Sequence, residues 1–234
     1  MDKRKQLTAK VADQINQIPT THPISVAVNG RIASGKTTFA MELAKTLESM
    51  GRPVLHVGVD GFHNPRAIRY RQGRSSARGY YEDAYDLAAV RRRLLDTLGE
   101  SDAEPEGWLV QTASLDLETD KPLDPDPISL TRDTVLIVDG SFLLGPVLRE
   151  AWDYSIFLDV SRDVATERGA RRDAPKLGGL SAAKHLHESR YQPACDLYIQ
   201  ENRPEHFAQV IIANDDPSNP ELKKIPKTHQ PRGA

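Results

Sequence analysis

Eight consecutive residues carry the clearest chemical signal in this chain of 234 amino acids. They run from Gly30 to Thr37, read GRIASGKT, and match the pattern G-x-x-x-x-G-K-[ST] at every required position. In such a loop the glycines let backbone N–H groups turn inward around a phosphate, and the N-terminus of the following helix adds partial positive charge. We expect Lys36 to reach the β- and γ-phosphates of a nucleotide and the Thr37 hydroxyl to hold Mg²⁺.

The setting of this loop favours phosphate binding over a chance match on a glycine-containing loop. The apolar run 24–28 before it predicts a buried strand, and residues 38–50 after it have the apolar spacing of a helix. Strand, glycine loop and helix are the context that the motif needs. The residues expected to contact the nucleotide within the loop are Gly30, Ser34, Gly35, Lys36, Thr37 and Thr38.

Two carboxylates follow other predicted strands. Asp139 ends the apolar run 135–138, a pattern in which a carboxylate helps to position Mg²⁺ against phosphates, although strands often end in Asp for other reasons. Asp60 ends the predicted strand 54–59 and is the candidate general base, which would accept the proton of an acceptor hydroxyl. A turn or helix-capping Asp before Gly61 is the alternative.

Three arginines lie on one predicted helix, residues 163–172. The spacing places Arg168 beside both Arg171 and Arg172, and clustered cations repel unless an anion lies among them. A lid that closes over nucleotide phosphates would supply that anion and stabilise charge in the transition state. The alternative is a solvated basic face paired with Glu167 and Asp173.

An aromatic and acidic patch between residues 80 and 86 could contact an acceptor molecule. Tyrosine rings can stack on a ring of the acceptor and carboxylates can bind sugar hydroxyls, but an acid-rich helix N-terminus with half-buried tyrosines is the alternative. The basic stretch 66–80 before the patch is predicted to be a mobile surface segment. Its arginines either steer an acidic substrate or are simply solvated.

The predicted elements define the fold class. Buried strands at 24–28, 54–59, 135–140, 155–158 and 210–212 alternate with helices at 3–17, 38–50, 83–98, 163–172 and 181–191. This alternation predicts an α/β protein with a parallel five-stranded sheet flanked by helices. Ligands of such sheets bind beyond the carboxyl ends of the strands, where Gly30, Asp60 and Asp139 would share one cleft.

Composition narrows the remaining choices. The net charge of −2 gives no general attraction to nucleic acid or to an anionic membrane, and no apolar run approaches a membrane span. The single Cys195 excludes an internal disulfide and suits a reducing cytoplasm, and no signal peptide is evident. We expect one domain over residues 1–216 and a loosely ordered tail over 217–234, with a homo-oligomer left open.

The order of the motifs resembles that of a known family. The strings VNGRIASGKTT, VDGFHNP, EDAYD, VLIVDGSFLL and RGARRD occur as in the uridine kinase and phosphoribulokinase family, over roughly residues 22–216. The resemblance implies a P-loop kinase fold with a small lid at about 165–180, Mg²⁺ and ATP, and transfer to a hydroxyl. It also implies that Asp60 is the base and that Arg168 and Arg172 are lid residues.

The same resemblance implies a small-molecule acceptor that binds near residues 60–120. The chain is most similar to proteins described as uridine kinase-like, which indicates the 5′-hydroxyl of uridine or cytidine. The expected acceptor-binding residues are Asp60, Phe62, His63, Tyr80, Tyr81, Asp83 and Asp116.

The chain differs from uridine kinases at the positions where those enzymes recognise the nucleobase. Leu115 and Asp120 stand where an aromatic residue and a His are expected, and the segment 80–83 lacks the usual His and Pro. The lid lacks a second arginine pair because residues 174–179 intervene. Similarity to pantothenate kinases and sugar kinases leaves pantothenate, a sugar or a sugar phosphate as alternative acceptors. A nucleotide-binding regulator without transfer activity is the third alternative.

Overall fold

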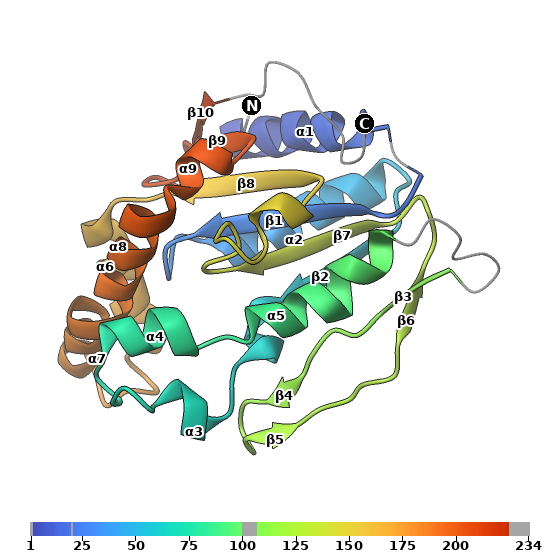
Figure 1. Ribbon diagram of the computed structural model, residues 1–234. Coiled ribbons are helices and arrows are strands. Elements are labelled where there is room, and N and C mark those ends of the chain that lie inside the picture. Colours follow the sequence, from blue (N-terminus) through green and yellow to red (C-terminus); the bar gives the residue numbers. More distant parts are fainter. Residues whose placement is uncertain (1, 20, 100–106, 225–234) are drawn as a thin grey trace.

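The computed structural model describes residues 2–19, 21–99 and 107–224. Its centre is a sheet with strand order β10-β9-β8-β1-β7-β2 (Figure 1). All neighbouring strands are parallel except β10, which runs antiparallel to β9. The strand bounds are β1 Ile24–Gly30, β2 Val54–Gly58, β7 Val135–Gly140, β8 Tyr154–Asp159, β9 Val210–Ala213 and β10 Glu221–Lys224.

The five parallel strands confirm the predicted sheet, and β10 adds a sixth strand to it. This strand lies in the segment expected to be a loosely ordered tail, so the sheet extends beyond residue 216. Leu222 explains the difference, because its half-buried side chain packs against the core next to β9. The part of the predicted tail after residue 224 lies outside the described residues.

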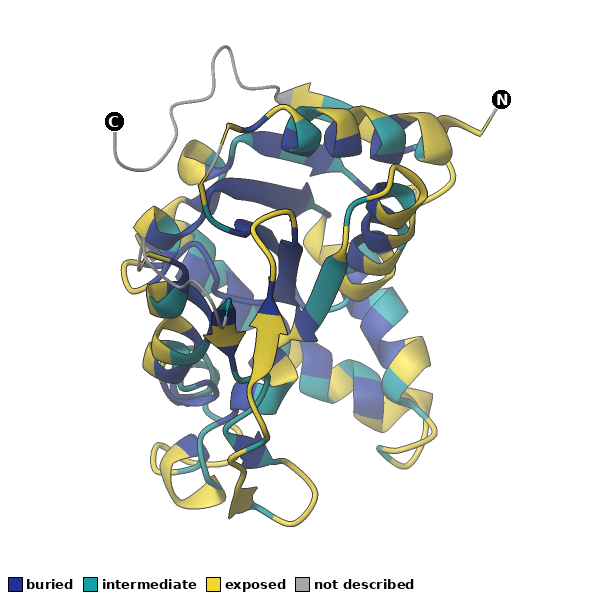
Figure 2. Ribbon diagram, turned by 90° about the vertical axis from the view of Figure 1, so that its right-hand side faces the viewer, coloured by how far each residue is buried: buried dark blue, intermediate teal, exposed yellow. Residues whose placement is uncertain are grey.

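Helices cover both faces of the sheet, as Figure 2 shows by the buried strands at the centre of the molecule. The first face packs against α1 (Lys3–Asn16) and α2 (Lys36–Ser49), which bury Val11, Leu43 and Leu47 completely. The second face packs against α5 (Leu87–Val90) with the turns after it, and against α8 (Gln192–Asn202). Apolar strands buried on both faces are what the sequence pattern predicts.

The predicted helix 83–98 begins later and is less regular than expected. Asp86 accepts a hydrogen bond from the N–H of Ala89 at 2.8 Å and thereby caps a helix that begins at Leu87. After α5 the backbone continues as a π-helical turn, Arg91–Leu95, and a 3₁₀ turn, Asp96–Gly99. The basic stretch expected to be mobile contains two short helices instead, α3 (Arg66–Arg69) and α4 (Ala77–Asp83).

Four short strands precede β7 in the chain and form two separate two-stranded sheets. The strand β3 (Trp108–Val110) pairs with β6 (Ile128–Leu130), and β4 (Leu115–Asp116) pairs with β5 (Lys121–Pro122). Residues 108–117 therefore contribute two short strands that pair with different partners. Pro122 is tolerated in β5 because this two-stranded ladder leaves its nitrogen at an edge.

The segment predicted to form a lid follows β8. It consists of α6 (Arg162–Asp173), α7 (Leu180–Leu186) and a π-helical turn, His187–Tyr191, that leads into α8. The connection between α6 and α7 ends in Gly178 and Gly179, whose φ angles of +80° and +110° favour glycine. A short α9 (Pro204–Phe207) precedes β9, and single 3₁₀ turns lie at Val59–Phe62 and Arg149–Ala151.

Within the described part of the chain, none of the helices combines the length and the apolar character that crossing a bilayer requires.

Candidate active site

The phosphate loop connects the end of β1 to the start of α2 and is shaped by close backbone contacts. A Cβ on Gly30 would lie 2.7 Å from the carbonyl oxygen of Leu158 on the neighbouring strand, so only glycine fits there. Gly35 has a φ of +91° and Ala33 a φ of +65°, the left-handed region that reverses the loop before α2. This backbone is the form that can present N–H groups to a phosphate.

Side chains from the far end of the chain hold the loop in place. The Asn214 side chain donates to the carbonyl oxygen of Ser34 at 2.8 Å, and the Asn214 backbone N–H bonds to Asp159 at the end of β8. The N–H of Ile32 donates to the sulfur of Cys195 at 3.4 Å, and burial raises the pKa of this thiol. The loop is therefore fixed from both β9 and α8.

Lys36 and Thr37 point into the space beyond the sheet. The Lys36 ammonium donates to the carbonyl oxygen of Arg31 at 2.7 Å, and burial lowers the pKa of Lys36 although Asp139 and Asp60 act to raise it. The Thr37 hydroxyl donates to Asp139 at 2.7 Å. The two predicted magnesium ligands therefore lie side by side, one in the first turn of α2 and the other on β7.

A cavity of about 310 Å³ opens beside this pair. Lys36 of the phosphate-loop motif lines this cavity together with residues from other segments. These residues are Asp60, Tyr80, Tyr85, Asp139 and Arg172. Asp60 lies in the 3₁₀ turn just after β2, is exposed, and accepts a hydrogen bond from the Tyr85 hydroxyl at 3.2 Å. Its carboxylate faces the same space as Lys36, as general-base chemistry requires.

A second cavity of about 380 Å³ adjoins the first, because both are lined by Lys36, Thr37 and Arg172. The start of α2, with Lys36, Thr37 and Thr38, lines it together with Arg168 and Arg172 of α6. A helix N-terminus that faces two arginines is suited to an anionic chain such as a polyphosphate.

The lid arginines are held by protein groups in this conformation. Arg168 donates to the backbone carbonyls of Asn214 and Asp215 at 3.0 and 2.6 Å. Arg172 makes two hydrogen bonds to the carboxylate of Asp173, at 2.8 and 3.0 Å, and this pairing raises the pKa of Arg172. Arg171, predicted to join them, does not line either cavity. The hydrogen bond from Lys184 lowers the pKa of Glu167, and the charge of Arg171 adds to this effect.

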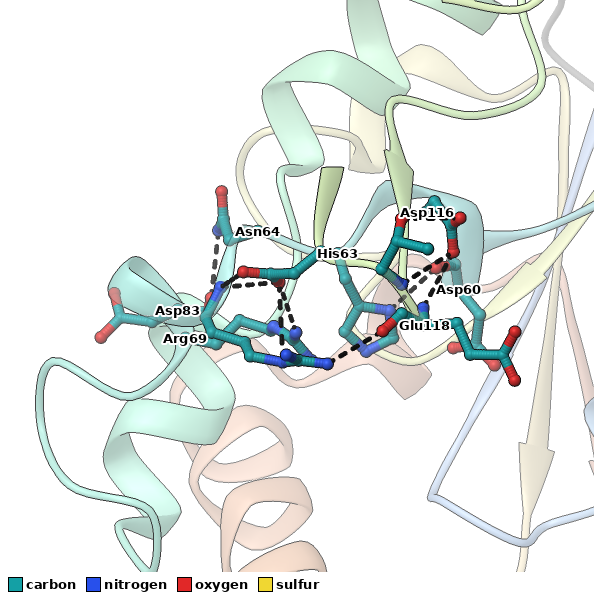
Figure 3. A network of polar contacts seen from close by, with 10 residues as sticks. Asp60, His63, Asn64, Arg69, Asp83, Asp116 and Glu118 are labelled. Atoms are coloured by element: carbon teal, nitrogen blue, oxygen red, sulfur yellow. Dashed lines mark hydrogen bonds and ion pairs between the residues drawn. The ribbon is translucent and has the colours of Figure 1, made fainter. Parts of the chain in front are cut away.

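The predicted acceptor residues divide into two groups. Tyr80 lines the smaller cavity, and His63 lies next to it, because its ring is 4.3 Å from that of Tyr85 and its Nδ1 is 2.9 Å from the carbonyl oxygen of Asp60. Burial lowers the pKa of His63. Figure 3 shows His63 between Asn64 and Arg69 on one side and the turn with Asp116 and Glu118 on the other.

The remaining acceptor candidates have internal roles. Phe62 is fully buried, and the Tyr81 hydroxyl accepts a hydrogen bond from Asn202 at 2.6 Å. Asp83 is buried and binds Arg71 and Gln72. Asp116 accepts from the hydroxyl and N–H of Thr119 in a local turn, and the Thr119 hydroxyl is the main reason that the pKa of Asp116 is lowered.

Most arginines of the stretch 66–78 are paired within the protein. Asp120 accepts from the N–H of Arg66 and from the Arg69 guanidinium at 3.0 Å, which ties α3 to the β4–β5 hairpin. Arg78 binds Glu201 at 2.7 Å. The stretch is therefore ordered by ion pairs, and the prediction of a mobile segment with simply solvated arginines is wrong for Arg66, Arg69 and Arg78.

Sequence reasoning missed two residues that contact the candidate site. His56 on β2 lies with its Nε2 2.8 Å from Asp139, and its only sequence signal is a polar residue within an apolar strand. His187 is fully buried with its Nε2 2.9 Å from Asp173, the partner of Arg172. Neither contact follows from residue spacing, because both join segments that are distant in sequence.

The chain is similar to known kinases in sequence and in fold. It is 29% identical over 206 residues to uridine-cytidine kinase B of Dictyostelium discoideum, covering 87% of this chain and 79% of that protein. It is also 29% identical over 170 residues to the pantothenate kinase of Corynebacterium aurimucosum, and this match covers 70% of the chain and 53% of that kinase. No family model matches the chain.

A solved structure described as a possible uridine kinase from Bacillus stearothermophilus has the same fold. It superimposes with a TM-score of 0.66 at 23% sequence identity, and the match covers 89% of this chain and 96% of the other. The P-loop kinase fold inferred from the sequence motifs is thereby confirmed, as is the resemblance to uridine kinase-like P-loop kinases.

Proposed function

We propose that this protein, a P-loop kinase similar to the uridine kinase and phosphoribulokinase family, transfers the γ-phosphoryl group of ATP to a hydroxyl of a small metabolite. One observation carries the proposal. A single cavity brings Lys36 of the phosphate loop together with Asp60, Asp139 and Arg172 from three other segments. We further propose that one domain supplies the whole site, with the lid at about 165–180 and the acceptor segment at about 60–120.

In this proposal the chain supplies positioning, a base and positive charge. Asp60 accepts the proton of the acceptor hydroxyl while that oxygen attacks the γ-phosphorus, and the bond from phosphorus to the bridging oxygen of ADP breaks. Lys36 and Arg172 stabilise the negative charge that develops on the transferred group and on the leaving oxygen. For this, Lys36 must leave the Arg31 carbonyl and Arg172 must leave Asp173, which the closing lid would permit.

Thr37 and Asp139 provide a donor set that suits Mg²⁺. Sites of this kind use one or two carboxylates together with substrate phosphates, and the Thr37 hydroxyl and the Asp139 carboxylate lie 2.7 Å apart at the cavity. When bound there, Mg²⁺ neutralises charge on the phosphates. His56 orients the second oxygen of Asp139 through its 2.8 Å contact.

A nucleoside, uridine or cytidine, is the first acceptor to test because the relative from Dictyostelium is a uridine-cytidine kinase. A second acceptor class includes pantothenate, sugars and sugar phosphates. It is supported by the side chains of Phe62, Tyr81 and Asp83, which are buried or hydrogen-bonded within the protein. Because these side chains contact other parts of the protein, fewer groups remain that could bind and recognise a nucleobase. The single buried Cys195 supports a cytoplasmic setting.

The test is an acceptor panel assayed by ADP release with Mg²⁺ and ATP, in wild type and in Asp60→Asn. We expect saturable turnover with at least one acceptor, and a loss of about 10²- to 10⁴-fold in Asp60→Asn, since the amide cannot accept the proton. Binding of a non-hydrolysable ATP analogue should be retained. Asp133→Asn, an exposed carboxylate between β6 and β7, is the matched control.

Three outcomes separate the alternatives. Turnover with uridine and cytidine alone would eliminate the second acceptor class. Full activity of Asp60→Asn would remove the assignment of the base. Nucleotide binding without phosphorylation of any acceptor would favour a regulatory protein that uses the phosphate loop only for binding.

A further inference from the structure

Arg190 is a buried cation without an ionic partner. It lies on the π-helical turn before α8, its residue is 8% exposed, and its Nε has no hydrogen-bond partner among the described residues. Among the described residues, Arg190 takes part in no ion pair with a carboxylate, and its guanidinium carbon lies 4.9 Å from the centre of the Tyr80 ring. A buried charge is costly without a counter-ion, and contact with aromatic rings offsets only part of this cost.

Further arginines gather at the same place. The guanidinium carbons of Arg190, Arg69 and Arg74 lie 5.5, 5.4 and 4.9 Å from the centre of one ring, that of Tyr70. We call these three residues the Tyr70 arginine cluster. Arg69 is 9% exposed and also has an unpartnered buried Nε, although its terminal nitrogen binds Asp120 at 3.0 Å. Three like charges with one carboxylate repel one another unless a further anion binds.

The cluster adjoins the reaction cavity on the side of Asp60. Tyr80, which Arg190 contacts, lines that cavity together with Asp60 and Arg172. On the other flank, Arg69 lies close enough to His63 for its charge to add to the effect of burial in lowering the pKa of that histidine. His63 in turn contacts both Asp60 and Tyr85. A small molecule with its hydroxyl at Asp60 would therefore extend toward the cluster.

We propose that Arg190, with Arg69, binds an anionic group of the acceptor, a carboxylate or a phosphate, while the acceptor hydroxyl lies at Asp60. The inference rests on the proposed function and narrows its acceptor to anionic hydroxyl compounds. An anion between two guanidinium groups would use their unpartnered Nε–H groups in charge-assisted hydrogen bonds. The chain would then disfavour neutral sugars and nucleosides, whose binding leaves the buried charge of Arg190 without a counter-ion.

Acceptors matched in shape and different in charge test the proposal. The first set is glycerol, D-glycerate and glycerol 3-phosphate, and the second is ribose, ribose 5-phosphate and uridine, each assayed by ADP release. We expect kcat/KM to be about 10- to 100-fold higher for an anionic member than for its neutral counterpart, the range typical of hydrogen bonds to charged groups. Comparison of D-glycerate with glycerol 3-phosphate distinguishes a carboxylate from a phosphate.

Substitution of Arg190 is the second test of the proposed anion site. Arg190→Gln should lower kcat/KM for the anionic acceptors by about 10- to 100-fold, mainly through KM, and leave the values for the neutral ones unchanged. Arg190→Lys keeps the charge and should retain part of the preference. Arg149→Gln is the matched control, because Arg149 also lies over an aromatic ring, 4.4 Å from the centre of Phe207. Thermal unfolding of each variant reports on folding.

A binding experiment separates this inference from the proposed function. With Mg²⁺ and a non-hydrolysable ATP analogue saturating the phosphate loop, inorganic phosphate should raise the melting temperature of wild type but not of Arg190→Gln. Failure of every acceptor together with this phosphate effect would refute the transferase and keep the anion site. Equal kcat/KM for neutral and anionic acceptors, or an equal loss for both in Arg190→Gln, would overturn the anion site.

Discussion

Burial of the Lys36 ammonium in the candidate site destabilises the folded protein. Burial lowers its pKa, so the charged ammonium is less favourable in the folded state than in the unfolded chain. The hydrogen bond to the Arg31 carbonyl compensates only in part. A nucleotide phosphate would add to the counter-charge of Asp139 and Asp60, which only partly offsets the effect of burial.

We predict that Lys36→Met separates function from stability. The variant should lose about 3 kcal/mol of transition-state stabilisation, which is 10²- to 10³-fold in kcat/KM, because a charge at the developing anion is removed. Its melting temperature without ligand should not fall, whereas the rise caused by Mg²⁺ and an ATP analogue should disappear. ADP release and thermal unfolding measure both, with the exposed Lys45→Met on the same helix as control. A variant that keeps the nucleotide-induced rise would contradict the role of Lys36.

The sequence predicts the location of a site residue well when that residue follows a strand. It predicts poorly which side chains pair with one another when the partners lie in separate segments. Lys36, Asp60 and Asp139 meet at one cavity because parallel strands end at the same edge of the sheet. Asp83 was equally plausible as a substrate carboxylate, yet it binds Arg71 of a preceding turn. That pairing depends on how α3 and α4 fold back on each other, which no periodicity encodes.

Among the elements, α6 is joined to the π-helical turn through Asp173. Its carboxylate accepts from Arg172 on the same helix and from His187 on the turn. Gly169 makes the approach feasible, because a Cβ there would lie 2.1 Å from the ring of His187. The lid helix and the turn that carries Arg190 are therefore held together as one unit.

We predict that Asp173→Asn alters the pH dependence of stability. Burial acts to raise the pKa of Asp173, but the hydrogen bonds from Arg172 and His187 outweigh it, so the pKa is lowered in the folded state. The carboxylate therefore contributes stability above its usual pKa of 3.8, and this contribution is lost as the pH falls through the lowered value. The melting temperature of the variant should lie below that of wild type at pH 7, and the gap should narrow toward pH 3.

Asp163→Asn, an exposed carboxylate in the first turn of α6, is the control for this experiment. A difference between wild type and Asp173→Asn that stays constant from pH 7 to pH 3 would contradict the assignment.

The sequence locates the regular elements more reliably than their ends and interruptions. The five parallel strands and the helices α1 and α2 follow from apolar runs and apolar spacing. The start of α5 depends on the Asp86 cap, and the π-helical turns depend on packing between elements. Two-residue strands such as β4 and β5 carry too few residues to produce a pattern.

For the molecule as a whole, β10 covers the outer edge of β9. We predict that truncation after Asp216, the domain end expected from sequence, lowers the free energy of unfolding by roughly 1–2 kcal/mol, because the ladder with β9 and the packing of Leu222 are lost. The exposed edge of β9 should also promote aggregation. Chemical denaturation and light scattering measure the two effects.

The control is truncation after Lys224, which keeps β10. Equal stability of the two truncated chains would contradict a structural role for this strand.

The clamp on the phosphate loop also bears on the synthesis of the protein. Asn214 and Ser34, which it joins, are 180 positions apart in the chain. Ribosomes extend a chain by about 5–20 residues per second, and domains fold as their residues emerge. The loop is thus made early, but it lacks its clamp until the last parallel strand has left the ribosome. A nascent chain that ends before Asn214 would therefore bind nucleotide weakly. ATP would stabilise only those chains that already include β9 and Asn214.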